Sequence, residues 1–288
     1  LQNPDARLDG DQISLLLTLG KMLAKKGQPF SLQIVQHFKE DTLGLLGLAI
    51  INANDAEEAL TVFQQYTEIF IPGFDFSMNY DDQVKYIDLA AAMRFEYILI
   101  DAWWDKNIGY DRMKELIQYA KSKGVDVFLW YNSNGVSNDA FQTPKDKMNR
   151  SMTRKKEMKW LKEAGVKGLK VDFFGGDKQE TMRLYEDILS DANDYGLMII
   201  FHGATLPRGW ERMYPNFVGS EAVTASEMLI FSQDVREREA FYASLHPFIR
   251  NSIASMEFGG VLLNKFLNKG NERGQKRLTT DAFQLATS

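Results

Sequence analysis

The sequence predicts an α/β protein with a (β/α)8 barrel of the TIM type. From about residue 70 onward, short apolar runs alternate with amphipathic helical segments. Near-continuous apolar strands that alternate with helices indicate a parallel sheet covered by helices. Polar residues cluster at the ends of five successive runs, where the active site of such a barrel is expected. A length of 288 residues is compatible with a single barrel domain.

Strand candidates and helices follow one another in a regular order. The apolar runs are residues 70–76, 96–104, 125–133, 166–174, 197–203, 218–223 and 252–258. Residues 110–124 predict a helix that ends at Gly124, with apolar residues at i, i+3, i+4 and i+7: Met113, Leu116, Ile117 and Ala120. Residues 177–196 predict another, with a single apolar stripe: Met182, Tyr185, Ile188, Leu189 and Ala192. These runs supply seven strands, one fewer than a closed barrel needs.

The chain divides near residue 68. Residues 69–288 carry the repeating pattern, whereas residues 1–68 predict a helix, a strand, a second apolar run and another helix. Because an open sheet edge must be covered in a soluble protein, we expect residues 45–67 to supply the eighth βα unit.

The composition excludes several classes of function. A hydrophobic content of 44% with 25% charged residues is typical of a soluble globular protein. The net charge of −5 argues against nucleic acid as a partner. No window reaches the ~20 apolar residues of a membrane span, and the first residues do not resemble a secretion signal. Without cysteine, the chain has no disulfide, thiolate ligand or thiol nucleophile. The oligomeric state stays open.

Candidate site residues lie where the runs end. They are Asp101 and Trp103, then Trp130 and Asn132, then Lys170 and Asp172, then His202, and finally Glu221 with Glu227 six positions later. Positions i and i+2 of a strand share a face, so Lys170 and Asp172 point the same way. We expect the ammonium group to lower the pKa of the carboxyl and keep it ionised, which suits a nucleophile. A purely structural ion pair is the alternative.

The residue types at these positions favour carbohydrate chemistry. The sequence contains no Ser-His-Asp order, no glycine-rich phosphate loop and no HExxH motif. Only three histidines are present, and His246 lies in an amphipathic helix where packing is expected, so a histidine-rich zinc site is disfavoured. Tryptophans can cover the apolar face of a pyranose, while amides and carboxylates hold its hydroxyls. Glycoside hydrolysis needs two carboxylates on opposite sides of the anomeric carbon.

Residues 168–223, from GLKVDFFGG to VGSEAV, closely resemble the barrel of glycoside hydrolase family 97, a family of α-glucosidases and α-galactosidases. The resemblance extends from about residue 80 to residue 287. Inverting members of the family carry a glutamate base directly after the fifth-strand histidine, where this chain has Gly203. Retaining, α-galactosidase-like members carry a nucleophilic aspartate on the fourth strand, which corresponds to Asp172. The resemblance therefore implies a retaining enzyme with Asp172 as its nucleophile.

The same resemblance implies the remaining roles. Glu227 corresponds to the proton donor, and Glu221 together with Glu227 to ligands of a calcium ion. The other strand-end residues are expected to bind substrate: Asp101, Trp103, Trp130, Asn132, Lys170 and His202. The implied substrate is a terminal α-linked hexose, with an α-galactoside favoured over an α-glucoside. The implied location is periplasmic or secreted.

Other interpretations remain open at this point. Family members have a large N-terminal β-sandwich domain and a small C-terminal β domain, and neither is recognisable in this sequence. The chain could therefore be a fragment, or a permuted or engineered form. A non-catalytic barrel that binds sugar weakly is the alternative function, and a barrel hydrolase that uses metal-activated water is a third.

Overall fold

A computed structural model describes residues 78–135, 138–225, 228, 232–258 and 276–286. In this part of the chain, five strands form one parallel sheet in the order β1-β2-β3-β4-β5. The strands are β1 (Tyr97–Ile100), β2 (Asp126–Asn132), β3 (Gly168–Asp172), β4 (Met198–Phe201) and β5 (Phe217–Ser220). Parallel strands that neighbour each other in chain order require a crossover between every pair. The predicted α/β fold with a parallel sheet is confirmed.

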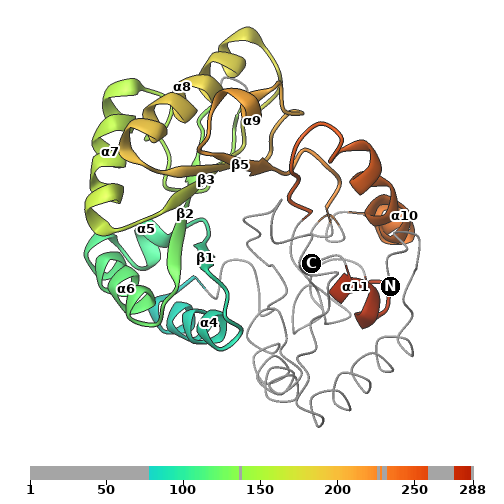
Figure 1. The fold of residues 1–288 in the computed structure, drawn as a ribbon, viewed down its shortest axis with the longest axis horizontal. Helices are drawn as coiled ribbons and strands as arrows, with labels where there is room; N and C mark the ends of the chain where they lie inside the picture. Colours follow the sequence, from blue (N-terminus) through green and yellow to red (C-terminus); the bar gives the residue numbers. More distant parts are fainter. Residues whose placement is uncertain (1–77, 136–137, 226–227, 229–231, 259–275, 287–288) are drawn as a thin grey trace.

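The helices lie along the outer side of the curved sheet (Figure 1). They are α4 (Tyr80–Ala92), α6 (Tyr110–Ser122), α7 (Ser151–Ala164) and α8 (Gln179–Tyr195), with the short α5 (Trp104–Asn107) and α9 (Trp210–Met213) between longer elements. Two further helices, α10 (Gln233–Ile249) and α11 (Asp281–Ala286), follow β5 in the chain. None of the helices in the described ranges is long and apolar enough to cross a membrane.

The predicted apolar stripes are the buried faces of α6 and α8. All four stripe residues of α6 are buried, and so are those of α8 except Met182, which is partly exposed. Gly124 follows the end of α6 with a φ of +79°, a left-handed conformation that glycine adopts at little cost. The sequence pattern thus located both helices and the turn that ends the first. His246 is buried on α10, as its position in an amphipathic segment predicted.

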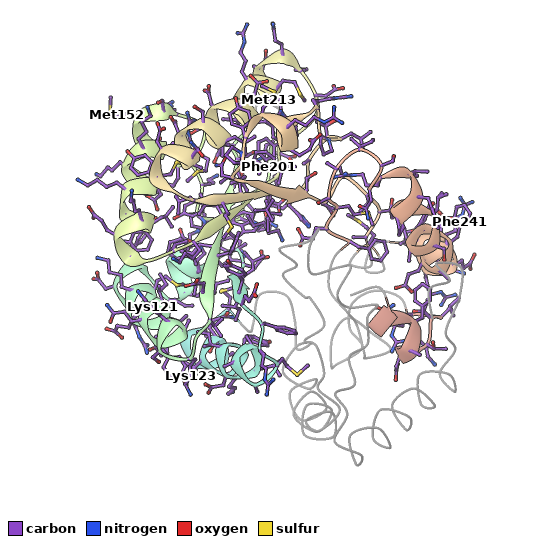
Figure 2. The ribbon with its side chains drawn as sticks, viewed as in Figure 1. Lys121, Lys123, Met152, Phe201, Met213 and Phe241 are labelled. Atoms are coloured by element: carbon purple, nitrogen blue, oxygen red, sulfur yellow. The ribbon has the colours of Figure 1, made fainter. Side chains whose placement is uncertain are left out.

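Both faces of β2 and β3 are buried, which explains why these strands are nearly continuous apolar runs. On β2, Val127, Leu129 and Tyr131 belong to the hydrophobic core, whereas Phe128 and Trp130 point to the opposite face. Phe201 of β4 is fully buried in the hydrophobic core, whereas Met152, Met213 and Phe241 lie on the outer surface (Figure 2).

The strand register places the polar residues on the face that points away from the helices. Trp130 pairs with Lys170, and Asn132 pairs with Asp172, so all four side chains share this face. Lys170 and Asp172 therefore point the same way, as predicted.

The seventh apolar run continues the sheet only in part. Met256 forms an isolated parallel bridge with Ser220 of β5, and the backbone N–H of Glu257 donates to the carbonyl of Ser220 at 3.0 Å. The first run, residues 70–76, and the expected closing unit, residues 45–67, lie outside the described residues. The division at residue 68 and the eighth strand therefore stay predictions.

A glycine-to-alanine change at the start of β3 tests the packing of the inner face. A Cβ at Gly168 would lie 2.2 Å from Cε1 of the buried Phe128 ring. Because that ring also packs edge-on against Tyr97 and cannot move freely, we expect Gly168→Ala to reduce the free energy of unfolding by about 1–3 kcal/mol in urea denaturation. Gly219→Ala on β5, where the nearest atom would be 3.5 Å away, is the control. Equal stability of the two variants would contradict this packing.

Candidate active site

Three of the predicted site residues converge at the carboxyl ends of adjacent strands. Asp172 is the last residue of β3, His202 follows β4 and Glu221 follows β5. The Nδ1 atom of His202 lies 3.6 Å from Oδ2 of Asp172 and 3.4 Å from Oε2 of Glu221. Each of the three residues is only 5% exposed. The sheet therefore brings two carboxylates and an imidazole together in a largely water-excluded position.

The Asp172 carboxylate is held by two donors from rigid parts of the fold. Its Oδ2 accepts a hydrogen bond from the indole Nε1 of Trp130 at 3.0 Å, and its Oδ1 accepts one from the backbone N–H of Phe173 at 2.7 Å. The Trp130 ring is buried and also packs edge-on against the Phe173 ring, with 5.8 Å between the ring centroids. Two donors on different oxygens fix the orientation of the group before any ligand arrives.

Burial governs the protonation of Asp172. Loss of solvation raises the pKa of this carboxyl to about 6, although the Lys170 charge and the Trp130 hydrogen bond act in the opposite direction. The expectation that Lys170 would hold this pKa below its usual value is therefore wrong in its net direction. The reason is that the loss of solvation outweighs the attraction to Lys170, whose ammonium group pairs directly with Asp101, with 2.9 Å between Nζ and Oδ2.

Lys170 stays charged in spite of its burial. Desolvation alone would lower the pKa of its ammonium group, but attraction to the surrounding carboxylates of Asp101, Asp172 and Glu257 raises it above the ordinary value. A fixed positive charge therefore lies beside the Asp172 carboxylate in the predicted site.

Glu257 is a site residue that the sequence analysis did not select. Its Oε2 lies 3.8 Å from Nε2 of His202, on the side of the ring opposite to Asp172 and Glu221. The signal was present, because Glu257 is a polar residue near the end of an apolar run, like the residues that were selected.

His202 is a neutral imidazole near pH 7. Burial lowers its pKa well below the ordinary value, and the Lys170 charge lowers it further. A neutral ring has one N–H donor and one acceptor nitrogen, so it can donate a hydrogen bond to one neighbour and accept one from another.

Gly203 lies directly against Asp172. Its φ is +49°, and a Cβ at this position would lie 2.7 Å from Oδ1 of Asp172 and 2.9 Å from the backbone nitrogen of Phe173. Its N–H donates to Oε2 of Glu221 at 3.0 Å. The close approach leaves no space for a side chain at residue 203.

The backbone is left-handed after every one of the five strands. The residues are Trp103 (φ 73°), Asn134 (53°), Phe173 (62°), Gly203 (49°) and Ala222 (46°). A non-glycine residue in this region costs about 1–2 kcal/mol, and such strain concentrates at functional sites. The strained positions follow the strand ends that carry the predicted site.

Asn132 is engaged by its own loop. It is fully buried, and its amide nitrogen donates to the carbonyls of Ala140 and Gln142 at 3.3 and 3.1 Å. Its amide oxygen accepts from the backbone of Asn134 and the side chain of Asn138. Direct sugar binding by Asn132 stays a prediction, whereas the structure shows it anchoring the loop after β2.

The expected calcium ligands are only partly visible. Glu221 lies in the site, but Glu227 lies outside the described residues. In the ranges that the structure describes, no group of three or more histidine, aspartate or glutamate side chains is arranged to hold a metal ion. Because Ca²⁺ takes six to eight oxygen ligands, the described residues do not form a calcium site by themselves.

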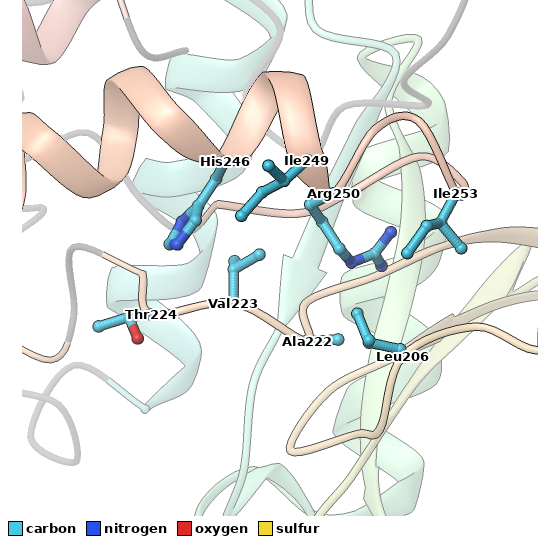
Figure 3. Close-up of a pocket in the computed structure, with 8 residues that line it drawn as sticks. All are labelled: Leu206, Ala222, Val223, Thr224, His246, Ile249, Arg250 and Ile253. Atoms are coloured by element: carbon cyan, nitrogen blue, oxygen red, sulfur yellow. The ribbon is translucent and has the colours of Figure 1, made fainter.

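A cavity of about 530 Å³ lies next to Glu221, at the end of β5 (Figure 3). Ala222, directly after Glu221, contributes to its wall, and Leu206 approaches from the loop after β4. His246, Ile249 and Arg250 of the α10 region form the opposite side. The Arg250 guanidinium also donates to the carbonyl and hydroxyl oxygens of Ser220, so it fixes α10 to the end of β5.

Comparison with protein families gives a match to the family described as Glycoside hydrolase 97, over residues 63–223. The match covers more than half of the chain and includes Asp172, His202 and Glu221. Two curated relatives are similar. A probable retaining alpha-galactosidase of Streptomyces bingchenggensis is 29% identical over 187 residues, which is 61% of this chain and 26% of the relative. A retaining alpha-galactosidase of Bacteroides thetaiotaomicron is 31% identical over 212 residues, 70% of this chain and 30% of the relative. The chain thus spans less than a third of either relative.

Solved structures give a second comparison. A beta-arabinopyranosidase is 65% identical, with a TM-score of 0.71, over 77% of this chain and 35% of that protein. A glycoside hydrolase family 97 enzyme of Pseudoalteromonas sp. strain K8, in complex with panose, is 16% identical with a TM-score of 0.52, over 74% of this chain and 36% of that protein. The second likeness concerns the fold alone.

Substitution of Gly203 tests the close approach to Asp172. We expect Gly203→Ala to lower the free energy of unfolding by more than Gly196→Ala, by about 1–3 kcal/mol in urea denaturation. Gly196 has a similar left-handed backbone (φ 69°), and a Cβ there would meet no atom within 4 Å apart from its own chain neighbours, so it reports the backbone cost alone. If both variants lose the same stability, the contact between residue 203 and Asp172 is not as described.

Proposed function

Because this chain belongs to glycoside hydrolase family 97, we propose that it is the catalytic part of a retaining glycosidase that forms a covalent glycosyl ester on Asp172. We further propose that its parallel sheet closes into a (β/α)8 barrel. The order of the five strands and the fold of the Pseudoalteromonas enzyme support this closure.

The contact between Gly203 and Asp172 carries the proposal. An inverting enzyme needs a base that activates water, and the resemblance puts that base at the position of Gly203. Here a Cβ would already meet Asp172 at 2.7 Å, so no base can project from residue 203. Glu221 is a second carboxylate nearby, whose Oε2 accepts the Gly203 N–H, and the family resemblance assigns it to the calcium ion instead. This leaves Asp172 as the carboxylate prepared for direct attack.

The chemistry follows from the way Asp172 is held. In the first step, an Asp172 oxygen bonds to the anomeric carbon while the bond to the leaving group breaks, and an acid protonates the leaving oxygen. In the second step, water gives its proton to the same acid, attacks the anomeric carbon and releases Asp172. Trp130 and the Phe173 N–H keep the nucleophile in one orientation throughout. We propose Glu227 as the acid and base, because the family resemblance assigns it this role.

The sugar we propose is a pyranoside with the ring configuration of galactose. A β-L-arabinopyranoside has the ring stereochemistry of an α-D-galactoside and lacks only the hydroxymethyl group at C5, so one site can accept either. The beta-arabinopyranosidase is 65% identical, whereas the alpha-galactosidases are 29–31% identical. We therefore propose a β-arabinopyranoside as the preferred substrate and an α-galactoside as the second candidate.

The proposal also includes a calcium ion as cofactor and a location outside the cytoplasm. We propose that Glu221 and Glu227 contribute oxygen ligands to a calcium ion, whose chemical contribution would be to orient the neighbouring carboxylates. The periplasmic or secreted location rests on the family resemblance.

Hydrolysis of two nitrophenyl glycosides tests the function. We expect the β-L-arabinopyranoside to give the higher kcat/KM, the α-D-galactoside a lower one, and a chelator to reduce both. NMR of the first-formed sugar should show the anomeric configuration of the substrate. A sugar of opposite configuration would exclude the ester mechanism, and absence of turnover for either glycoside, with calcium added, would favour a non-catalytic barrel.

Removal of the nucleophile should be reversible by a small anion. Asp172→Ala should lower kcat by at least about a thousandfold, because no group remains to form the ester. Added azide should restore turnover and give a glycosyl azide of inverted configuration. Asp187→Ala, an exposed position on α8, is the matched control and should keep full activity without azide. Failure of azide rescue in a folded Asp172→Ala protein would assign the nucleophile elsewhere.

The pH dependence should report the ionisation of Asp172. Its pKa is raised to about 6, and only the ionised form attacks, so kcat/KM should fall as the pH decreases through about 6. Lys170→Met removes a positive charge that favours the ionised form of Asp172, so the fall in kcat/KM should occur at a higher pH. Lys167→Met, at an exposed position beside β3, should leave it in place. If the pH at which kcat/KM falls is the same in Lys170→Met as in the unchanged protein, a group other than Asp172 controls the pH dependence.

A further inference from the structure

Two aromatic side chains, the partly buried Trp103 and the exposed Phe141, form a pair beyond the strand ends that carry the site. Trp103 follows β1 and Phe141 lies in the loop after β2, with ring centroids 5.8 Å apart and planes inclined by 46°. Phe141 is 69% exposed, which is unusual for a phenylalanine in an ordered loop. The Lys106 ammonium group lies 4.8 Å from the centre of the Trp103 ring.

The backbone on both sides of Phe141 is fixed by one buried side chain. The amide nitrogen of Asn132 donates to the carbonyls of Ala140 and Gln142, the two neighbours of Phe141. Asn132 is fully buried at the end of β2, so this anchor belongs to the sheet rather than to the surface. The loop therefore presents Phe141 to solvent from a constrained backbone.

The loop is also tied to the backbone that carries Trp103. The Trp103 N–H donates to the carbonyl of Thr143, and the Thr143 hydroxyl donates to Asp105. The two rings are thus presented by connected segments. An exposed aromatic surface that is already ordered loses little conformational entropy when it binds a ligand, which makes it suitable for recognition.

Exposure increases outward from Asp172 toward this pair. Asp172 and Lys170 are 5% and 8% exposed, the side chain of Asp101 is 46% exposed, and Phe141 is 69% exposed. The direct contact between Lys170 and Asp101 connects the buried end of this series to the rim. Under the proposed function, the sugar that reacts lies against the buried Asp172, and the leaving group extends toward the more exposed residues, among them Asp101 two positions before Trp103.

We propose that Trp103 and Phe141 form a subsite that binds a pyranose ring of the leaving group by stacking. A pyranose has one face made largely of C–H groups, and an aromatic ring covers such a face without requiring directional hydrogen bonds. The proposal rests on the proposed function and deepens it, because it means that the natural substrate carries a second sugar beyond the scissile bond.

A comparison of leaving groups tests the subsite. The glycosyl fluoride of the sugar that is cleaved best has a leaving group too small to reach the aromatic pair, whereas a disaccharide with the same sugar (melibiose for the α-galactoside) can reach it. In Phe141→Ala, the ratio of kcat/KM for the disaccharide to kcat/KM for the fluoride should fall about tenfold. Phe141→Tyr should keep the ratio, and so should Phe248→Ala, a phenylalanine of α10 with 70% exposure.

Each outcome decides the proposal. A ratio that does not change in Phe141→Ala, or falls equally in Phe248→Ala, overturns it even if the enzyme hydrolyses both substrates. If the protein hydrolyses no glycoside, the proposed function fails separately, and saturation-transfer NMR with melibiose tests the subsite. Weaker transfer to melibiose from Phe141→Ala than from the unchanged protein supports the aromatic pair. Equal transfer, or none from the unchanged protein, overturns it.

Discussion

The candidate site depends on the close approach of two strand ends. The chain leaves β4 with its backbone against the Asp172 carboxylate, and this is possible only because residue 203 has no side chain. The same backbone segment donates to Glu221 from β5 and accepts from Phe174 beyond β3. One glycine therefore fixes the relative positions of carboxylates from two different strands.

The electrostatics of the site show a balance between burial and pairing. Asp172, Lys170, His202 and Glu221 are each at most 8% exposed, and burying such groups is costly unless they interact with one another. Lys170 is stabilised by several carboxylates, whereas Asp172 remains poorly solvated despite its two hydrogen bonds. An ionised carboxylate with little solvation is less stable and more reactive than one in water. The left-handed non-glycine residues after four of the five strands add to this local cost, which the packed core on the other face of the sheet must offset.

Some of the residues that were expected to bind substrate hold neighbouring protein groups in place. Trp130 and Asn132 are both buried, and both act on neighbouring protein groups: Trp130 on the Asp172 carboxylate and Asn132 on the loop after β2. The groups with accessible surface are farther out, at Asp101 and Phe141. A rigid inner layer and an accessible outer layer are what a site needs when it holds one sugar firmly and admits various partners at the rim.

The sequence by itself determined the repeating architecture and the side of the sheet on which the site lies. Apolar periodicity is a local property, so it located α6, α8 and the strands, and the period of two placed Lys170 and Asp172 on one face. The resemblance also selected Asp172, His202 and Glu221, which the fold brings together. The tertiary structure alone decided which partner each charge has. It paired Lys170 with Asp101, raised the pKa of Asp172, added Glu257 and used Asn132 as a loop anchor. These results depend on distances between residues that are far apart in the chain and on the solvent they lose, and spacing along a sequence contains neither quantity.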